Sequence, residues 1–267
     1  MRALSIASTG MLAQQTNVEV IANNLANMNT TGFKMSRAEF QDLLYQNIQS
    51  PGAQTSDTGT YAASGIQIGA GVRTAAIYRV TTQGDLKSTS NPYDVAIQGA
   101  GFFRIQQADG TDAYTRAGNF GLSPEGQLVT QDGLLVQPGI AIPQNTLSVQ
   151  INAQGQVMAT VAGNATPQTV GQLELTRFPN EAGDKAALFA TIGPNLYLET
   201  PSSGAPQAGV PGSVGYGTIQ QGFLETANVN SVDEITALIT AQRAYEMNSK
   251  VVSAADQMLQ NTARLGS

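Results

Sequence analysis

The feature that most constrains this chain is its C-terminal stretch, residues 231–265, which contains no proline or glycine and repeats apolar residues at helical spacing. Ser231 and Glu234 have the spacing of a capping box, in which each side chain accepts a hydrogen bond from the other residue's backbone N–H. At about 1.5 Å per residue, the predicted helix is roughly 50 Å long. Charged and amide side chains recur every few residues, which excludes a membrane span. The residues expected to pack against neighbouring helices are Ile235, Leu238, Ile239, Tyr245, Val252, Met258 and Leu259.

The N-terminal segment, residues 3–28, supplies a candidate partner helix. Its apolar residues alternate in steps of three and four, which is the seam of a heptad repeat, and only Gln14 interrupts the pattern. An asparagine-rich run followed by Gly32 predicts the end of this helix, because asparagine and glycine tolerate left-handed backbone conformations. The expected packing residues are Leu4, Met11, Val18, Ile21, Leu25 and Met28. The expected turn residues are Asn23, Asn24, Asn27 and Gly32, and Phe33 follows as the first residue of a new element.

Two arrangements of these helices fit the pattern. They can pack on each other as a stalk within one molecule, or they can polymerise with helices of other copies. The apolar residues of the C-terminal helix spread over more than one narrow seam, so this helix needs more than one neighbour. The periodicity therefore favours self-assembly, and so, weakly, does the low charged fraction of 12%.

Composition removes several classes of function. The net charge is −6 with no basic run, which disfavours nucleic-acid binding and attachment to an anionic membrane. The chain has no cysteine and no histidine, so thiol nucleophiles, Cys-ligated metals and Ser/His/Asp systems are excluded. The first fifteen residues lack a secretory apolar region, so we expect any export to proceed without a cleaved signal of that kind.

The apparent ligand motifs have structural explanations. The Gly-x-Gly runs at 69–71 and 99–101 precede strand patterns, whereas a dinucleotide fingerprint precedes a helix. The segment 109–112 lacks the length and the final glutamate of an EF-hand and predicts a hairpin turn. We therefore expect no catalytic residue, no cofactor and no metal.

The segment that follows the first helix is harder to interpret. Residues 36–47 fit a short helix, with Phe40, Leu43 and Leu44 on one face. Residues 45–65 have no periodicity and are rich in Ser, Thr, Gly and Ala. A structureless stretch of this length is either a flexible linker or a functional segment.

From residue 66 to about residue 220 the pattern is β. Turn dipeptides recur about every ten residues, which is typical of an all-β sandwich or barrel-like domain. The segment 201–217 is predicted to be a Pro/Gly-rich loop. Strand candidates are 66–68, 72–82, 93–98, 101–107, 113–116, 127–131, 134–136, 147–151, 156–161, 170–178, 187–191 and 195–199. The predicted fold class is α+β, with long terminal helices forming a coiled-coil-like assembly core and an all-β domain between them.

Three groups of motifs occur in order along the chain. They are ANNLAN at 22–27 with TGFK at 31–34; QGDL at 83–86, DVAIQGAGFF at 94–103 and YTRAGNF at 114–120; and NVN at 228–230, QRAYE at 242–246 and ADQML at 255–259. Together they resemble bacterial flagellar rod and hook proteins over nearly the whole chain. Residues 51–56 are similar to the extra segment that distinguishes distal-rod members of this family from hook members.

The resemblance implies a subunit of a rigid hollow drive shaft that transmits torque from motor to hook, and not an enzyme. It implies a helical core formed by residues 1–32 and 228–267, a linking region at 33–65 and an outer β domain at 66–227, with Asn228 and Asn230 as signature residues. It also implies that the linking region stiffens the shaft, through Tyr45, Pro51, Gly52, Gln54 and Gly65.

The same resemblance implies the location and the partners. The location is the basal body, where the rod crosses the periplasm. The partners are further copies in a helical tube, proximal rod subunits, the hook protein, the P- and L-ring bushing proteins and the type III export apparatus, without nucleic acid or a membrane span. Two other functions stay open: an extracellular β-rich adhesin or glycan-binding module with a coiled-coil stalk, and a polysaccharide hydrolase using two carboxylates.

Overall fold

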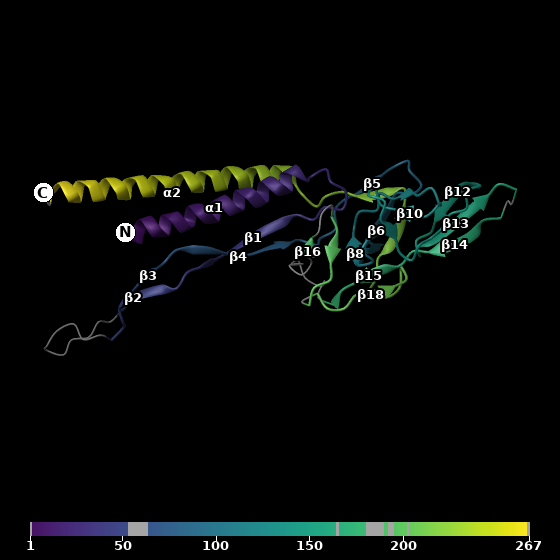
Figure 1. Ribbon diagram of the computed structural model, residues 1–267. Helices are drawn as coiled ribbons and strands as arrows, with labels where there is room; N and C mark the ends of the chain where they lie inside the picture. Colours follow the sequence, from purple (N-terminus) through teal and green to yellow (C-terminus); the bar gives the residue numbers. More distant parts are fainter. Residues whose placement is uncertain are drawn as a thin grey trace. The chain divides into compact units, whose positions relative to one another are not determined.

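The computed structural model describes residues 2–52, 64–163, 166–179, 190–191, 195–201 and 203–265. Helix α1 (Arg2–Ala26) and helix α2 (Ser231–Leu265) stand at the two ends of an otherwise strand-rich chain (Figure 1), so the predicted α+β class is confirmed. The chain divides into two compact units. The helical unit contains Met1–Asn23, Ser36–Ile77 and Ser231–Ser267, and the β unit contains Asn24–Met35 and Tyr78–Asn230.

The two helices of the helical unit lie side by side and run in opposite directions (Figure 1). Gly10 marks a close approach, because a Cβ atom there would lie 2.8 Å from Nδ2 of Asn248. Further along α1, Val18 lines the same cavity as Gln242 and Tyr245. Glycine costs an isolated helix about 1 kcal/mol relative to alanine, but at this position it gives the Asn248 side chain room against α1.

Small side chains dominate the buried part of the helices. Ala7 and Ala13 of α1 and Ala241 and Ala255 of α2 are all buried. The larger apolar residues of α2 mostly lie on other faces of that helix and are exposed. Contact between α1 and α2 therefore covers only a narrow strip of α2.

A pair of two-stranded ribbons completes the helical unit. Strand β1 (Ser36–Asp42) pairs with β4 (Val72–Arg79), and β2 (Tyr45–Gln49) pairs antiparallel with β3 (Ile66–Gly69). The ribbons contact α1, where the Val72 N–H donates to Oγ1 of Thr9 over 3.3 Å.

The predicted helix at residues 36–47 is wrong, because these residues form β1 and β2. Their backbone groups bond to distant segments instead of to each other; for example, the Leu43 N–H donates to the Gly71 carbonyl over 2.9 Å. The supposed apolar face is not buried either, since Leu44 is 90% exposed. Long-range strand pairing thus outweighed a weak local preference. The pairing also gives structure to the start of the segment 45–65, of which residues 53–63 lie outside the described part.

Strands in the β unit are short, and most lie where alternating or apolar runs predicted them. One seven-stranded sheet has the order β16-β17-β8-β7-β11-β10-β9, a three-stranded sheet has the order β12-β13-β14, and two-stranded pairs are β15-β18, β19-β6 and β20-β5. The bounds are β5 Leu86–Ser88, β6 Val95–Gln98, β7 Phe103–Gln106, β8 Asp112–Thr115, β9 Gly121–Leu122, β10 Leu128–Val129, β11 Leu135–Val136, β12 Thr146–Ile151, β13 Gln156–Val161, β14 Gln168–Gln172, β15 Leu175–Arg177, β16 Ala190–Thr191, β17 Tyr197–Leu198, β18 Gln207–Gly209, β19 Thr218–Gln221 and β20 Phe223–Glu225.

Several strands differ from the predicted candidates: β5, β9, β19 and β20 were not among them, and of the candidate at 187–191 only residues 190–191 are described. The single candidate at 170–178 is divided between β14 and β15, and the predicted loop at 201–217 contains β18. Strand β18 carries no apolar alternation of its own and is defined by its pairing with β15. Pairing of this kind is decided by the partner strand, so local sequence does not reveal it.

Side chains at the start of β7 point alternately to opposite faces of the strand, so two neighbouring phenylalanines belong to two different buried clusters. The Phe103 side chain joins the main apolar cluster with Val95, Ile97 and Ile105, all of them 0% exposed. Phe102, one residue earlier, faces a second, aromatic cluster, as the two-residue period of a strand requires. The other members of that cluster are Tyr114, Phe178 and Tyr197. Burial is the main cause that raises the pKa of the Tyr114 and Tyr197 hydroxyls.

Candidate assembly interface and buried charge network

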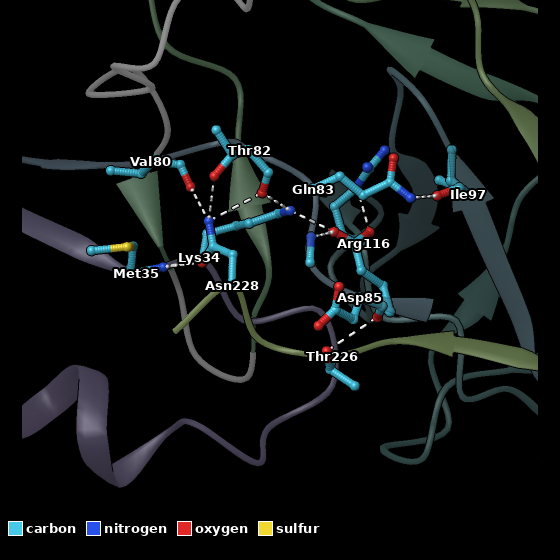
Figure 2. A network of polar contacts seen from close by, with 12 residues as sticks. Lys34, Met35, Val80, Thr82, Gln83, Asp85, Ile97, Arg116, Thr226 and Asn228 are labelled. Carbon is cyan, nitrogen blue, oxygen red and sulfur yellow. Dashed lines mark hydrogen bonds and ion pairs between the residues drawn. The ribbon is translucent and has the colours of Figure 1, made fainter. Parts of the chain in front are cut away.

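A buried carboxylate joins distant parts of the β unit. Glu225, the last residue of β20, has a fully buried side chain. Its Oε1 accepts hydrogen bonds from Nζ of Lys34 over 2.5 Å and from the Gly84 N–H over 3.0 Å. Its Oε2 accepts from Nε of Arg116 over 3.0 Å. Figure 2 shows Lys34 and Arg116 converging within this network. One carboxylate thus ties together three segments that are each more than a hundred residues away along the chain.

Both cations have further acceptors. Nζ of Lys34 donates to the Thr82 carbonyl over 2.7 Å. Nη1 of Arg116 donates to the carbonyls of Gly99 over 2.8 Å and Gly101 over 2.6 Å. A buried ion is tolerated only when its lost hydration is replaced by such contacts. The network therefore fixes the backbone of two loops, those between β4 and β5 and between β6 and β7, as well as the charges.

Asn228 forms the second part of this junction. Its Nδ2 donates to the carbonyls of Val80 over 2.9 Å and Thr82 over 3.0 Å, and its Oδ1 accepts the Met35 N–H over 2.7 Å (Figure 2). The signature asparagine thus joins the segment that follows α1 to the segment that precedes α2. The other predicted signature asparagine of this region, Asn230, is exposed.

Gly32 sits in a turn that requires glycine. Its φ is +66°, in the left-handed region. A Cβ atom at this position would lie 2.6 Å from the Ala117 nitrogen, and the Gly32 N–H donates to the Glu225 carbonyl over 2.8 Å. Phe33, the next residue, is buried, and the Arg79 guanidinium lies 5.8 Å from the centre of its ring.

The asparagine run before Gly32 forms turn contacts. The Asn27 N–H donates to the Asn24 carbonyl over 3.2 Å, and the Thr30 hydroxyl donates to Oδ1 of Asn27 over 3.2 Å. Asn24 is buried, whereas Asn23 is exposed. Helix α1 ends at Ala26, within this run.

We expect Gly32→Ala to lower the stability of the β unit by more than about 3 kcal/mol, because left-handed strain of about 1–3 kcal/mol adds to a clash with backbone atoms. Gly110→Ala is the matched control: Gly110 has a φ of +83°, and a Cβ atom added there would meet nothing within 4 Å. That variant should lose only the strain energy. Urea denaturation of both variants measures the difference, and equal losses would show that the close approach at Ala117 is unimportant.

The predicted packing residues of the helices divide into three groups. Ile21 is buried, and the half-buried residues are Leu4, Met11, Val18, Leu25, Leu238 and Val252. The exposed residues are Met28 (37%), Ile235 (46%), Ile239 (46%), Tyr245 (45%), Met258 (64%) and Leu259 (40%). Five of these six exposed residues belong to α2, so most of the uncovered apolar surface among the predicted residues is on that helix. Their role in subunit packing stays a prediction.

Four of the residues predicted to stiffen the shaft are described, and they lie on or beside the ribbon formed by β2 and β3. Tyr45 begins β2 and is 58% exposed, and Pro51 and Gly52 form an exposed turn beyond it. Gly65 lies against this turn, since a Cβ there would be 2.7 Å from Cδ of Pro51. Gln54 lies outside the described residues. The structure thus brings Pro51 and Gly65 together, while the stiffening role stays a prediction.

The apparent ligand motifs are turns and strand ends. Oδ1 of Asp109 accepts the Thr111 N–H over 2.9 Å and the Thr111 hydroxyl over 2.6 Å, and these bonds lower the pKa of the Asp109 carboxyl. The loop joins β7 to β8, as the hairpin prediction required. In the described part of the chain, no three Asp or Glu side chains group as metal ligands would. Neither described helix combines the length and the hydropathy of a membrane span.

Sequence reasoning did not identify the buried network of Lys34, Arg116 and Glu225. A signal was present: each is a charged residue in a chain with only 12% charged residues, and two of them belong to the motifs TGFK and YTRAGNF. Charges at such positions indicate buried pairing. The motif alone could not show which charge meets which, because the partners are far apart along the chain.

Comparison with known proteins covers both ends and the middle of the chain. Residues 4–34 match the family described as flagella basal body rod protein, residues 96–159 match the flagellar hook protein FlgE/F/G D1 domain, and residues 220–265 match the flagellar basal body rod FlgEFG protein C-terminal region. The chain is 55% identical to the flagellar basal-body rod protein FlgG of Caulobacter vibrioides, over 100% of both chains. It is 51% identical to FlgG of Agrobacterium fabrum over 97% of both chains, and 48% identical to FlgG of Buchnera aphidicola over 98% of this chain and 99% of the relative.

Proposed function

Because this chain belongs to the flagellar basal-body rod protein family, we propose that it is a structural subunit of the distal rod, which polymerises into a rigid hollow shaft that transmits torque from motor to hook. The observation that carries the proposal is the apolar surface of α2. Ile235, Ile239 and Val251 are each between 46% and 48% exposed, although α1 already lies beside this helix. Exposed apolar surface that recurs along a helix marks a site of protein association.

In this proposal the ends of the chain form the tube and the β-rich part faces outward. Residues 1–32 and 228–267 are the assembly core, residues 33–65 link it to the outside, and residues 66–227 form the outer domain. The proposed partners are further copies, proximal rod subunits, the hook protein, the P- and L-ring bushing proteins and the type III export apparatus. The proposed location is the rod where it crosses the periplasm, and the proposed role is mechanical, not catalytic.

The buried network supports a mechanical role. Within the β unit, Lys34 and Met35 of the segment after α1 bond to Glu225 and Asn228 of the segment before α2. Ion pairs and backbone hydrogen bonds fasten both segments at one place. Force that arrives through either segment therefore reaches the same rigid junction, as a torque-transmitting subunit needs.

Electron microscopy of the concentrated purified protein tests this function. We expect straight hollow tubes of indefinite length. A small closed oligomer that binds a glycan through its β unit would instead support the adhesin, and a compact monomer at every concentration would refute the assembly proposal.

We expect deletion of residues 46–63 to leave a polymer that is more flexible or curved. The deletion removes most of β2 and the turn at Pro51 that contacts Gly65, so contacts that hold neighbouring subunits in one orientation would be lost. Measuring filament curvature in micrographs checks the result. A control that replaces the same residues with a flexible linker of equal length separates the loss of contacts from the change in length. A polymer as straight as the original would argue against a stiffening role.

A further inference from the structure

The two helices of the helical unit differ in length. Helix α1 has 25 residues and α2 has 35. The helices run antiparallel with Gly10 opposite Asn248. Counting eight residues back from Gly10 to Arg2, and eight forward from Asn248, reaches Asp256. Residues 257–265, here called the overhang, therefore extend past the described part of α1, as Figure 1 shows at the C-terminal end of α2.

The overhang is about 13 Å of helix with uncovered apolar side chains. Met258 is 64% exposed and Leu259 is 40% exposed. A helical end of this length gains little stability from its own hydrogen bonds and depends on packing. The overhang consequently needs a covering surface.

A surface of the required kind lies between α1 and α2. A cavity of about 320 Å³ is lined by Gln15, Val18, Gln242, Tyr245 and Glu246, and is here called the groove. Val18 is half-buried and Tyr245 is 45% exposed, so both can contact a further apolar side chain. A cavity of about 150 Å³ already holds a benzene molecule, so this one has room for the side chains of Met258 and Leu259.

The overhang cannot reach the groove of its own molecule. Met258 follows Tyr245 by thirteen residues on the same unbroken helix, which separates the two by about 20 Å. The occupant must come from another chain. Charge also matches between copies, because the overhang carries Arg264 and the groove carries Glu246.

We propose that the overhang of one copy docks in the groove of a second copy, with Met258 and Leu259 against Val18 and Tyr245. The contact joins two different surfaces, so it repeats from copy to copy instead of closing a two-fold dimer, and it builds an open helical polymer when the rotation between copies does not close a ring. The inference rests on the proposed rod function and names the surfaces through which successive subunits meet.

Two complementary variants test the contact. Met258→Gln with Leu259→Gln removes the apolar overhang, and Tyr245→Gln with Glu246→Lys alters the groove; glutamine and lysine preserve helix propensity at these positions. Each variant should raise the critical concentration for polymerisation at least tenfold in a sedimentation assay. Thr240→Gln, at an exposed position of α2 outside both surfaces, is the control and should leave the critical concentration unchanged.

Mixing the two variants gives the decisive result. The overhang variant keeps an intact groove and the groove variant keeps an intact overhang. Below the critical concentration of each variant, where each alone is monomeric, an equimolar mixture should form one-to-one heterodimers, detected by native mass spectrometry. Circular dichroism confirms that both are folded. Folded variants that form no heterodimer, or that polymerise as readily as the original chain, would overturn the inference. A failure of the original chain itself to form tubes would instead count against the rod function.

Discussion

Replacing Glu225 by glutamine should lower the free energy of unfolding of the β unit by about 3–5 kcal/mol, the usual cost of removing one partner from a buried ion pair. The glutamine has nearly the same shape, so packing is preserved. Lys34 and Arg116 keep their charges, and their side chains are 3% and 5% exposed. They would lose the carboxylate with which both form a salt bridge.

The chain contains a matched control for this prediction. Arg104 and Asp112 form an ion pair over 3.5 Å with side chains 33% and 40% exposed. Asp112→Asn should cost no more than about 1 kcal/mol, because water already screens that pair. Urea denaturation followed by tyrosine fluorescence measures both variants. Similar losses in the two would show that Glu225 is not the centre of the junction.

A double variant tests whether the uncompensated buried charge of Lys34 causes the loss of stability in Glu225→Gln. In Lys34→Met with Glu225→Gln, one buried cation is removed together with the carboxylate. If uncompensated charge causes the loss, this double variant should be more stable than the sum of the two single changes predicts, since neighbouring groups couple non-additively. Strict additivity would mean that the two residues act independently.

The parts of this fold that sequence could predict depend on local pattern. Helix α2 begins at Ser231 and ends at Leu265, as expected, because capping and periodicity lie within the helix itself. The hairpin at Asp109 was predictable for the same reason: its hydrogen bonds join residues two apart. Strands β1 and β18 were not predictable, because distant partners define them.

The distinction between local pattern and distant partners also applies to the turn at Gly32 and to the buried charge network of Glu225. The turn at Asn27 and Gly32 follows from the conformational preferences of asparagine and glycine, so sequence located it. The reason that Gly32 lacks room for a side chain is the backbone of Ala117, which no local pattern contains. The partners of Glu225 lie 191 and 109 residues away. Charge pairing over such separations becomes visible only in the folded chain.

Substitutions on the exposed apolar face of α2 should have a second large effect, which is on polymerisation. Ile239→Asp combined with Ile235→Asp should raise the critical concentration for polymerisation at least a hundredfold, while the monomer keeps its fold. Both side chains are 46% exposed, so the isolated molecule loses little burial. Residues four apart share one helix face, and burying two isoleucines contributes about 1.5–3 kcal/mol each. Since about 1.4 kcal/mol corresponds to a factor of ten, the loss of both explains the expected size.

The control is Thr240→Asp, which adds one negative charge, against two in the double variant, one residue beyond Ile239 at an exposed position of α2. It should change the critical concentration by less than tenfold, because no apolar contact is lost. Sedimentation at several protein concentrations measures assembly, and circular dichroism checks the monomer. If the double variant polymerised like the original chain, the exposed isoleucines would not be an assembly surface. The proposed rod function would then lose its main structural support, because within the described residues neither the ribbon nor the β unit offers a comparable helical face for building the wall of a tube.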